Sequence, residues 1–166
     1  MSQLTIDIFE LARSCRTLEG EVALEDMPEL GKTVRSLKDG IVRFVAVGLG
    51  TVRQYPAVSL SIEGEAEMSC ARCMEAVSVP FAHELTFLLT KSEADADRIP
   101  LDEDGEDEDV IVGSKSFDVN AWVQEEVLLT LPAIAVHEDC EAPAHDEAPE
   151  PETNNPFAAL AALKRN

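Results

Sequence analysis

Two consecutive stretches of alternating apolar and polar residues constrain the fold of this chain more than any other feature. Residues 57–68, AVSLSIEGEAEM, and residues 77–89 repeat with a period of two, as half-buried strands do. The apolar residues on the shared side are Val58, Leu60, Ile62, Ala66, Met68, Val77, Val79, Phe81, Leu85, Phe87 and Leu89. A short connection joins the stretches, so the sequence predicts an antiparallel hairpin with one face in a core.

The connection between the two stretches contains Cys70 and Cys73, separated by two residues. A C-x-x-C turn lets both sulfurs converge on one ion, and structural zinc takes four such ligands in a tetrahedron. Beyond Pro132, His137 and Cys140 repeat the same two-residue gap. The spacing predicts one structural zinc ion held by these two pairs, with no coordination position left for water.

Two other interpretations of the cysteines stay open at this point. The first is a thioredoxin-like redox pair, although such a pair begins a helix after a strand, and here a second strand follows. The second is a set of reduced thiols without any ligand, because single C-x-x-C halves are common. The remaining cysteine, Cys15, stands alone and is expected to be an ordinary free thiol.

Shorter patterns predict the elements around the hairpin. Apolar runs predict strands at 4–9, 17–24, 41–49 and 110–113. These strands and the hairpin together favour one antiparallel sheet of about five or six strands.

Two segments have the 3.6-residue apolar period of helices. The first spans 26–38 and has Pro28 in its first turn; the second spans 118–131 and is capped by Asp118. The predicted fold class is therefore α+β, a single antiparallel sheet with both helices packed against it. The residues expected to form most of the core are Val58, Leu60, Ile62, Val79, Phe81, Leu85, Phe87, Trp122 and Val127.

The formal net charge of −20 is distributed unevenly along the chain. Residues 1–90 carry 13 acids and 8 bases, whereas residues 91–166 carry 20 acids and 5 bases. Residues 93–109 alone hold ten acids and one base. Self-repulsion and the scarcity of apolar residues predict that this segment is a mobile loop within a domain spanning 1–140.

The C-terminal residues are predicted to lie outside that domain. Residues 141–155 are rich in Pro, Ala and Glu, which favours a disordered acidic linker. Residues 156–166 follow Asn155 as a cap and have Pro156 at the first helical position, so a short C-terminal helix is expected.

Composition and missing motifs argue against several classes of function. Lys and Arg are outnumbered more than two to one, so the chain should repel nucleic acid at long range. Phosphate-binding glycine loops, GxSxG and HExxH are absent, so we expect neither an enzyme nor a small-molecule substrate. The sequence has no signal-peptide pattern and no run of 18 apolar residues, which predicts a cytoplasmic protein without a membrane role.

Three motifs occur in an order that resembles the YceD family of large ribosomal RNA subunit accumulation proteins. They are CARCM at 70–74, VQEEVLLTLPAIAVHEDC at 123–140 and NPFAALAALK at 155–164, with the acidic segment between the first two. The resemblance extends over roughly residues 17–166. It implies a role in accumulation of 23S ribosomal RNA and in biogenesis of the large ribosomal subunit.

Two functional classes agree with that resemblance. In the first, the protein is a non-enzymatic assembly factor that binds the precursor of the large subunit or one of its basic proteins, with direct contact to 23S rRNA as a further option. In the second, it handles zinc or thiols, as a redox-gated holdase or a zinc donor. The charge favours the first class, and the residues expected to contact the partner are Arg72, Phe157 and Leu160.

Overall fold

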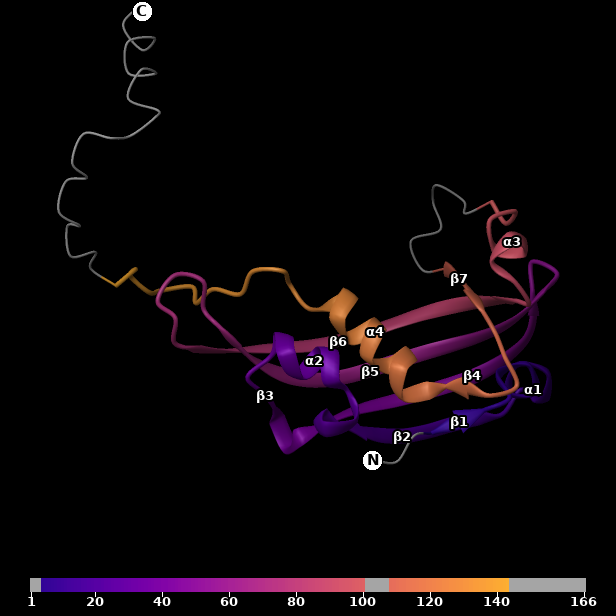
Figure 1. Ribbon diagram of the computed structural model, residues 1–166, viewed down its shortest axis with the longest axis horizontal. Coiled ribbons are helices and arrows are strands. Elements are labelled where there is room, and N and C mark those ends of the chain that lie inside the picture. Colours follow the sequence, from indigo (N-terminus) through magenta and orange to yellow (C-terminus); the bar gives the residue numbers. More distant parts are fainter. Residues whose placement is uncertain (1–3, 101–107, 144–166) are drawn as a thin grey trace, which may run out of the picture.

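The predicted hairpin forms the centre of the protein in the computed structural model, which describes residues 4–100 and 108–143 (Figure 1). Its strands are β5 (Tyr55–Ser69) and β6 (Ala76–Thr90). They pair antiparallel without a break from Ala57 opposite Leu88 to Ser69 opposite Ala76. The prediction of a hairpin with the C-x-x-C motif at its tip is confirmed.

The sheet around this hairpin has six strands and is mixed, not purely antiparallel as predicted. In spatial order the strands are β2 (Thr17–Ala23), β4 (Ile41–Val52), β5, β6 and β7 (Glu108–Val112), with β3 (Ser36–Leu37) also beside β5. The antiparallel prediction is wrong at β7, which runs parallel to residues 86–90 of β6. Seventeen residues separate the two strands along the chain, which is enough for the crossover connection that a parallel neighbour requires.

The N-terminal region contains a helix where the sequence predicts a strand at 4–9. Only β1 (Thr5–Ile6) is extended, and it pairs with β8 (Phe117–Asp118) in a separate two-stranded sheet. Helix α1 (Ile8–Ser14) begins immediately afterwards. The reason is a local cap: the Asp7 carboxylate accepts a hydrogen bond from the backbone N–H of Glu10 at 3.0 Å.

Helix α1 packs tightly on β4 because of Gly48. A Cβ atom at this position would collide with the backbone carbonyl oxygen of Leu11. The close approach buries Ile8 and Ala12 completely, one helical turn apart on the same side of α1.

The helix predicted at 26–38 is much shorter than expected. The chain forms a 3₁₀ turn at Leu24–Asp26, helix α2 at Pro28–Thr33, β3, and a second 3₁₀ turn at Lys38–Gly40. The prediction of Pro28 in the first turn is confirmed, but the helix ends where the N–H of Arg35 donates to the Glu67 carbonyl of β5 at 2.7 Å. Pairing with the sheet therefore replaces the last helical turns.

Helix α4 (Val119–Thr130) agrees with the prediction at 118–131. The carboxylate of Asp118 caps it by accepting from Ala121 N at 3.1 Å. Trp122 packs edge-on against Phe87 of β6 and Phe117 of β8, with ring centroids 5.0 and 5.4 Å away. This helix joins the two sheets through one aromatic cluster.

The main core lies between the sheet and α1, α2 and α4. Seven of the nine predicted core residues are buried, and Val79 and Leu85 are half-buried against them. A smaller cluster on the other face unites Ala57, Leu88 and Ile99. Ile99 follows helix α3 (Glu93–Ala96), so the prediction of a mobile loop is wrong for the first part of 93–109.

Several predictions fall on residues that the structure does not describe. They concern the middle of the acidic loop at 101–107, nearly all of the linker at 141–155 and the helix at 156–166. Among the helices in the described part of the chain, none has the length and apolarity needed to cross a membrane.

One buried carboxylic acid on α4 is predicted to make stability depend on pH. Burial, followed by the nearby negative charges of Asp109 and Glu125, raises the pKa of Glu126 from an ordinary 4.5 to about 7. The folded state therefore binds this proton more tightly than the unfolded state, so stability is greatest below the unfolded pKa and falls as the pH rises through about 7.

We expect Glu126→Gln to remove this decline and to raise the free energy of unfolding at about pH 8 by about 1 to 2 kcal/mol. Urea unfolding at about pH 5 and pH 8 measures the effect. Glu25→Gln is the control and should change the slope little, because Glu25 is exposed and is not among the groups that raise the pKa of Glu126. An unchanged slope in Glu126→Gln would contradict the assignment.

Candidate metal centre

The tip of the β5–β6 hairpin is a tight turn that positions two sulfurs. The N–H of Met74 donates to the carbonyl of Cys70 at 2.9 Å, and the N–H of Cys70 donates to the carbonyl of Glu75 at 2.8 Å. Met74 adopts a left-handed conformation with φ of 66°, which reverses the chain. The turn is therefore fixed by its own backbone, with Cys70 buried and Cys73 half-buried.

The segment that follows α4 passes over this turn (Figure 1). The carbonyl of Ala135 accepts a hydrogen bond from the N–H of Ala71 at 2.8 Å. Two residues later, Nε2 of His137 lies 2.9 Å from the carbonyl oxygen of Ala76, at the start of β6. These contacts bring His137 and Cys140 to the hairpin tip. Along the chain, both residues lie more than 60 positions after Cys70 and Cys73.

The four predicted ligand residues lie together. Sγ of Cys70 is 3.6 Å from Sγ of Cys140, and Sγ of Cys73 is 3.4 Å from Nδ1 of His137. All four ligand atoms lie within 4.8 Å of one another. Two sulfurs bound to one zinc ion are about 3.7 Å apart, given Zn–S bonds of about 2.3 Å in a tetrahedron. The cluster can therefore hold a metal ion such as zinc.

The hydrogen bond of His137 determines which ring nitrogen faces the sulfurs. A carbonyl oxygen only accepts, so Nε2 must carry the proton that it donates to Ala76. Nδ1 of the neutral ring then keeps a lone pair directed at Cys73. Metal-binding histidines are commonly oriented in this way by a backbone carbonyl.

The thiols of the cluster differ in acidity. The backbone N–H groups of Cys73, then those of His137 and Arg72, lower the pKa of Cys70 to about 5 in spite of its burial. Burial, followed by the neighbouring sulfurs of Cys70 and Cys73, raises the pKa of Cys140. Without a cation, the negative charge of one thiolate makes deprotonation of the neighbouring thiols less favourable. A divalent metal ion removes that conflict, because it stabilises every thiolate that it binds.

Two arginines brace the cluster. From the segment after α2, Arg35 donates to Ser69 Oγ and to the carbonyl of Met74, both at 2.8 Å. Nη1 of Arg72 donates to the carbonyl of Cys140 at 2.9 Å, so this predicted partner-binding residue joins the two halves of the site. Its role toward a partner stays a prediction. Phe157 and Leu160 lie outside the described residues.

Sequence reasoning missed Arg35 as part of this centre. The residue lies 34 positions before Ser69, within a segment that was predicted to be helical. Only the pairing of β3 with β5 carries its side chain to the hairpin tip. No short-range sequence pattern signals that contact.

The metal content is the first test of the cluster. Protein purified without chelator is expected to contain about one zinc ion per chain, because the site offers four protein ligands. Cys73→Ser and Cys140→Ser should each lower the zinc content, and Co²⁺ bound in place of zinc should show the absorption of tetrahedral thiolate coordination. Cys15→Ser is the matched control, because Cys15 is a free, exposed thiol. Full zinc content in Cys140→Ser would exclude the four-ligand arrangement.

The bracing by Arg35 gives a second test. Arg35→Ala should weaken zinc binding by about tenfold without removing a ligand, because the hairpin turn loses two hydrogen bonds. Competition with a chelator of known affinity measures the change. Arg13→Ala, which removes an exposed arginine paired with Glu10, should leave the affinity unchanged. Equal affinities for all three proteins would contradict this role.

The comparison with protein families agrees with this arrangement of residues. The model of the family described as large ribosomal RNA subunit accumulation protein YceD matches residues 58–164, which include nearly all of the hairpin and all four residues of the metal cluster. No curated protein and no solved structure matches the chain. Because the match spans more than half of the sequence, the chain belongs to the YceD family of large ribosomal RNA subunit accumulation proteins.

Proposed function

We propose that this protein is a non-enzymatic factor in biogenesis of the large ribosomal subunit, needed for accumulation of 23S rRNA. Membership in the YceD family is the observation that carries the proposal. The protein would act by binding the precursor subunit or one of its basic proteins. A chain with a net charge of −20 is suited to such partners, because its field attracts Lys- and Arg-rich surfaces.

The placement of the basic residues supports a protein partner over bare RNA. The arginines and lysines of the first 90 residues are Arg13, Arg16, Lys32, Arg35, Lys38, Arg43, Arg53 and Arg72. Five of these eight form ion pairs with carboxylates of the same chain. Their charge is therefore largely balanced locally, whereas phosphate binding requires cations that are free to release counterions.

Zinc would have a structural role in this proposal. All four ligands come from the protein, so a tetrahedral ion has no position left for water or substrate. The ion would hold the segment after α4 against the hairpin tip and so stabilise one end of the body. Folding and metal binding are then coupled.

A second function, handling of zinc or thiols, rests on one specific observation. Cys70 has a pKa of about 5, so its sulfur is a thiolate at neutral pH if no metal is bound. A redox-gated holdase or a zinc donor would use that reactivity. Complementation separates the two functions, because a structural site tolerates loss of thiol exchange provided that the fold survives.

The primary test is genetic. Deletion of the gene should lower the ratio of 23S to 16S rRNA and of large to small subunits, measured by RNA electrophoresis and sucrose gradients. The wild-type gene should restore both ratios. A normal ratio in the deletion strain would overturn the proposed function. Restoration by Cys70→His, which keeps a zinc ligand but removes the thiol on which the thiol-handling alternative rests, would argue against that alternative.

The charge argument gives a separate prediction. Affinity for basic proteins extracted from large subunits should fall steeply as salt approaches the concentration at which the Debye length is about 8 Å. Changing the five acids of residues 102–107 to Asn and Gln should slow association. Glu108 is left unchanged, because it forms an ion pair with Arg53 at 3.0 Å. Salt-independent affinity would contradict an electrostatic mode of binding.

A further inference from the structure

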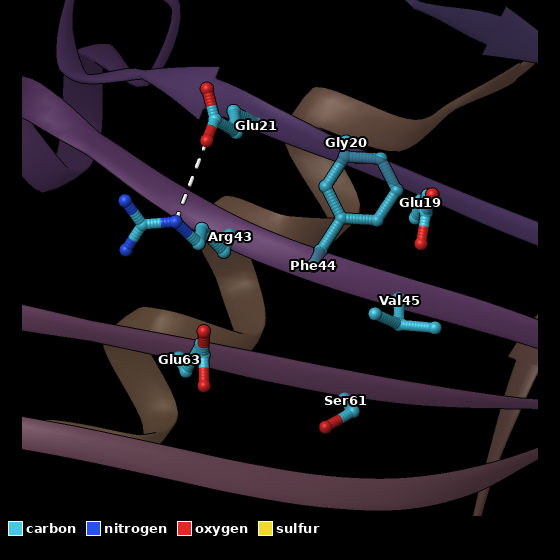
Figure 2. A pocket seen from close by; sticks show the side chains of 8 residues that line it. All are labelled: Glu19, Gly20, Glu21, Arg43, Phe44, Val45, Ser61 and Glu63. Atoms are coloured by element: carbon cyan, nitrogen blue, oxygen red, sulfur yellow. Dashed lines mark ion pairs between the residues drawn. The ribbon is translucent and has the colours of Figure 1, made fainter.

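One face of the main sheet has no covering helix over its central part, within the residues that the structure describes. Figure 2 shows this face with α4 behind the sheet and the side chains of Glu21, Arg43 and Glu63 projecting on the near side. The small cluster around Ile99 covers only the end next to the β4–β5 turn. We call the uncovered surface of β2, β4, β5 and β6 the open face.

The register of the strands arranges the open face in rows. One row runs Glu19, Val45, Ser61, Glu84 across the four strands. The next runs Glu21, Arg43, Glu63, Ala82. With strands about 4.8 Å apart, a row is about 14 Å wide, which is enough to seat a helix whose diameter with side chains is about 10 to 12 Å.

Carboxylates predominate on this face and most of them are unpaired. The six glutamates are Glu19, Glu21, Glu63, Glu65, Glu67 and Glu84. Arg43 pairs with Glu21 at 3.4 Å and Lys38 with Glu65 at 2.8 Å. The side-chain carboxylates of the other four have neither an ion pair nor a hydrogen bond within 4–100 and 108–143.

An apolar strip runs between these carboxylates along β4. Val45 is 38% exposed in the middle of the sheet, a high value for a valine in a central strand, and Val47 continues the strip. Glu19, Glu21, Arg43, Ser61 and Glu63 surround Val45 and line a shallow depression with it (Figure 2). The surface thus combines an apolar centre with an acidic border, the anatomy of a protein-binding surface.

We propose that the open face binds a cationic amphipathic segment of a large-subunit protein. The apolar side of the segment would cover Val45 and Val47, while its Lys and Arg side chains would reach the unpaired carboxylates of Glu19, Glu63 and Glu84. This inference rests on the proposed function and gives it a contact surface within the folded body. The same carboxylates repel RNA, and they repel a second copy of this face.

The test compares two sets of substitutions with the same change in charge. Glu19→Gln, Glu63→Gln and Glu84→Gln together neutralise the open face. Glu25→Gln, Glu75→Gln and Glu125→Gln together neutralise three exposed acids outside it. The probe is a fluorescent 18-residue amphipathic peptide of Lys and Leu, and anisotropy at about 0.15 M salt measures its dissociation constant.

We expect the open-face triple variant to bind the peptide about tenfold more weakly than wild type, and the control triple variant less than about threefold more weakly. Val45→Thr with Val47→Thr keeps the shape and strand propensity of both residues. This pair should weaken binding of the amphipathic peptide but not of oligolysine. Hydrogen exchange should show protection of β4 and β5 by the peptide, and thermal unfolding verifies that all variants are folded.

Equal weakening by the two triple variants would overturn the inference, because net charge alone would then explain binding. Stronger binding of single-stranded RNA than of the peptide, or dimerisation through the open face seen by sedimentation, would also overturn it. Complementation separates the two proposals. If the open-face variant binds proteins of the large subunit as wild type does and restores 23S rRNA, this inference fails while the proposed function stands. If deletion leaves 23S rRNA unchanged but the peptide results hold, the proposed function fails and the binding surface stands.

Discussion

The long antiparallel pairing of β5 with β6 is the interaction on which the rest of the structure depends. Its register runs unbroken over thirteen residue pairs, so each side chain of both strands is assigned to one of two faces. One face carries the buried residues under α4, and the other carries the glutamates. A slip of one residue would exchange the two faces. The same register places Cys70 and Cys73 at the tip, where their sulfurs converge.

The hairpin alone leaves its tip without a core of its own. Cys70 is buried there, yet its neighbours Ala71, Met74 and Glu75 are exposed. The segment after α4 compensates through the backbone bond between Ala135 and Ala71, the bond from the His137 ring to the Ala76 carbonyl, and the cluster of four potential metal ligands. A metal ion bound by this cluster would replace the apolar contacts that a larger hydrophobic cluster would supply, as in many small metal-binding domains.

The sequence predicted the strands and helices whose apolar patterns are long, and it predicted the metal cluster because Cys and His are distinctive metal ligands. The two long alternating stretches joined by a short connection predict the hairpin. Asp118 as the cap, with Trp122 and Val127 at helical spacing, predicts α4. Val34 and Leu37 also fit the helical period, so the sequence predicted that the helix continued to residue 38, whereas α2 ends at Thr33. The pairing of β3 with β5 ends the helix early, and local periodicity in a sequence cannot reveal such long-range pairing. The parallel direction of β7 and the position of Arg35 were missed for the same reason.

The pairing of β1 with β8 joins Thr5 to Asp118, residues separated by more than a hundred positions. During synthesis on the ribosome, the N-terminal strand therefore has no partner until most of the body has left the exit tunnel. Contacts of this sequence separation also carry a large loop-closure entropy, which makes them late events in folding. Strand β1 then joins the molecule late, whereas α1 can pack on β4 as soon as that strand has been made.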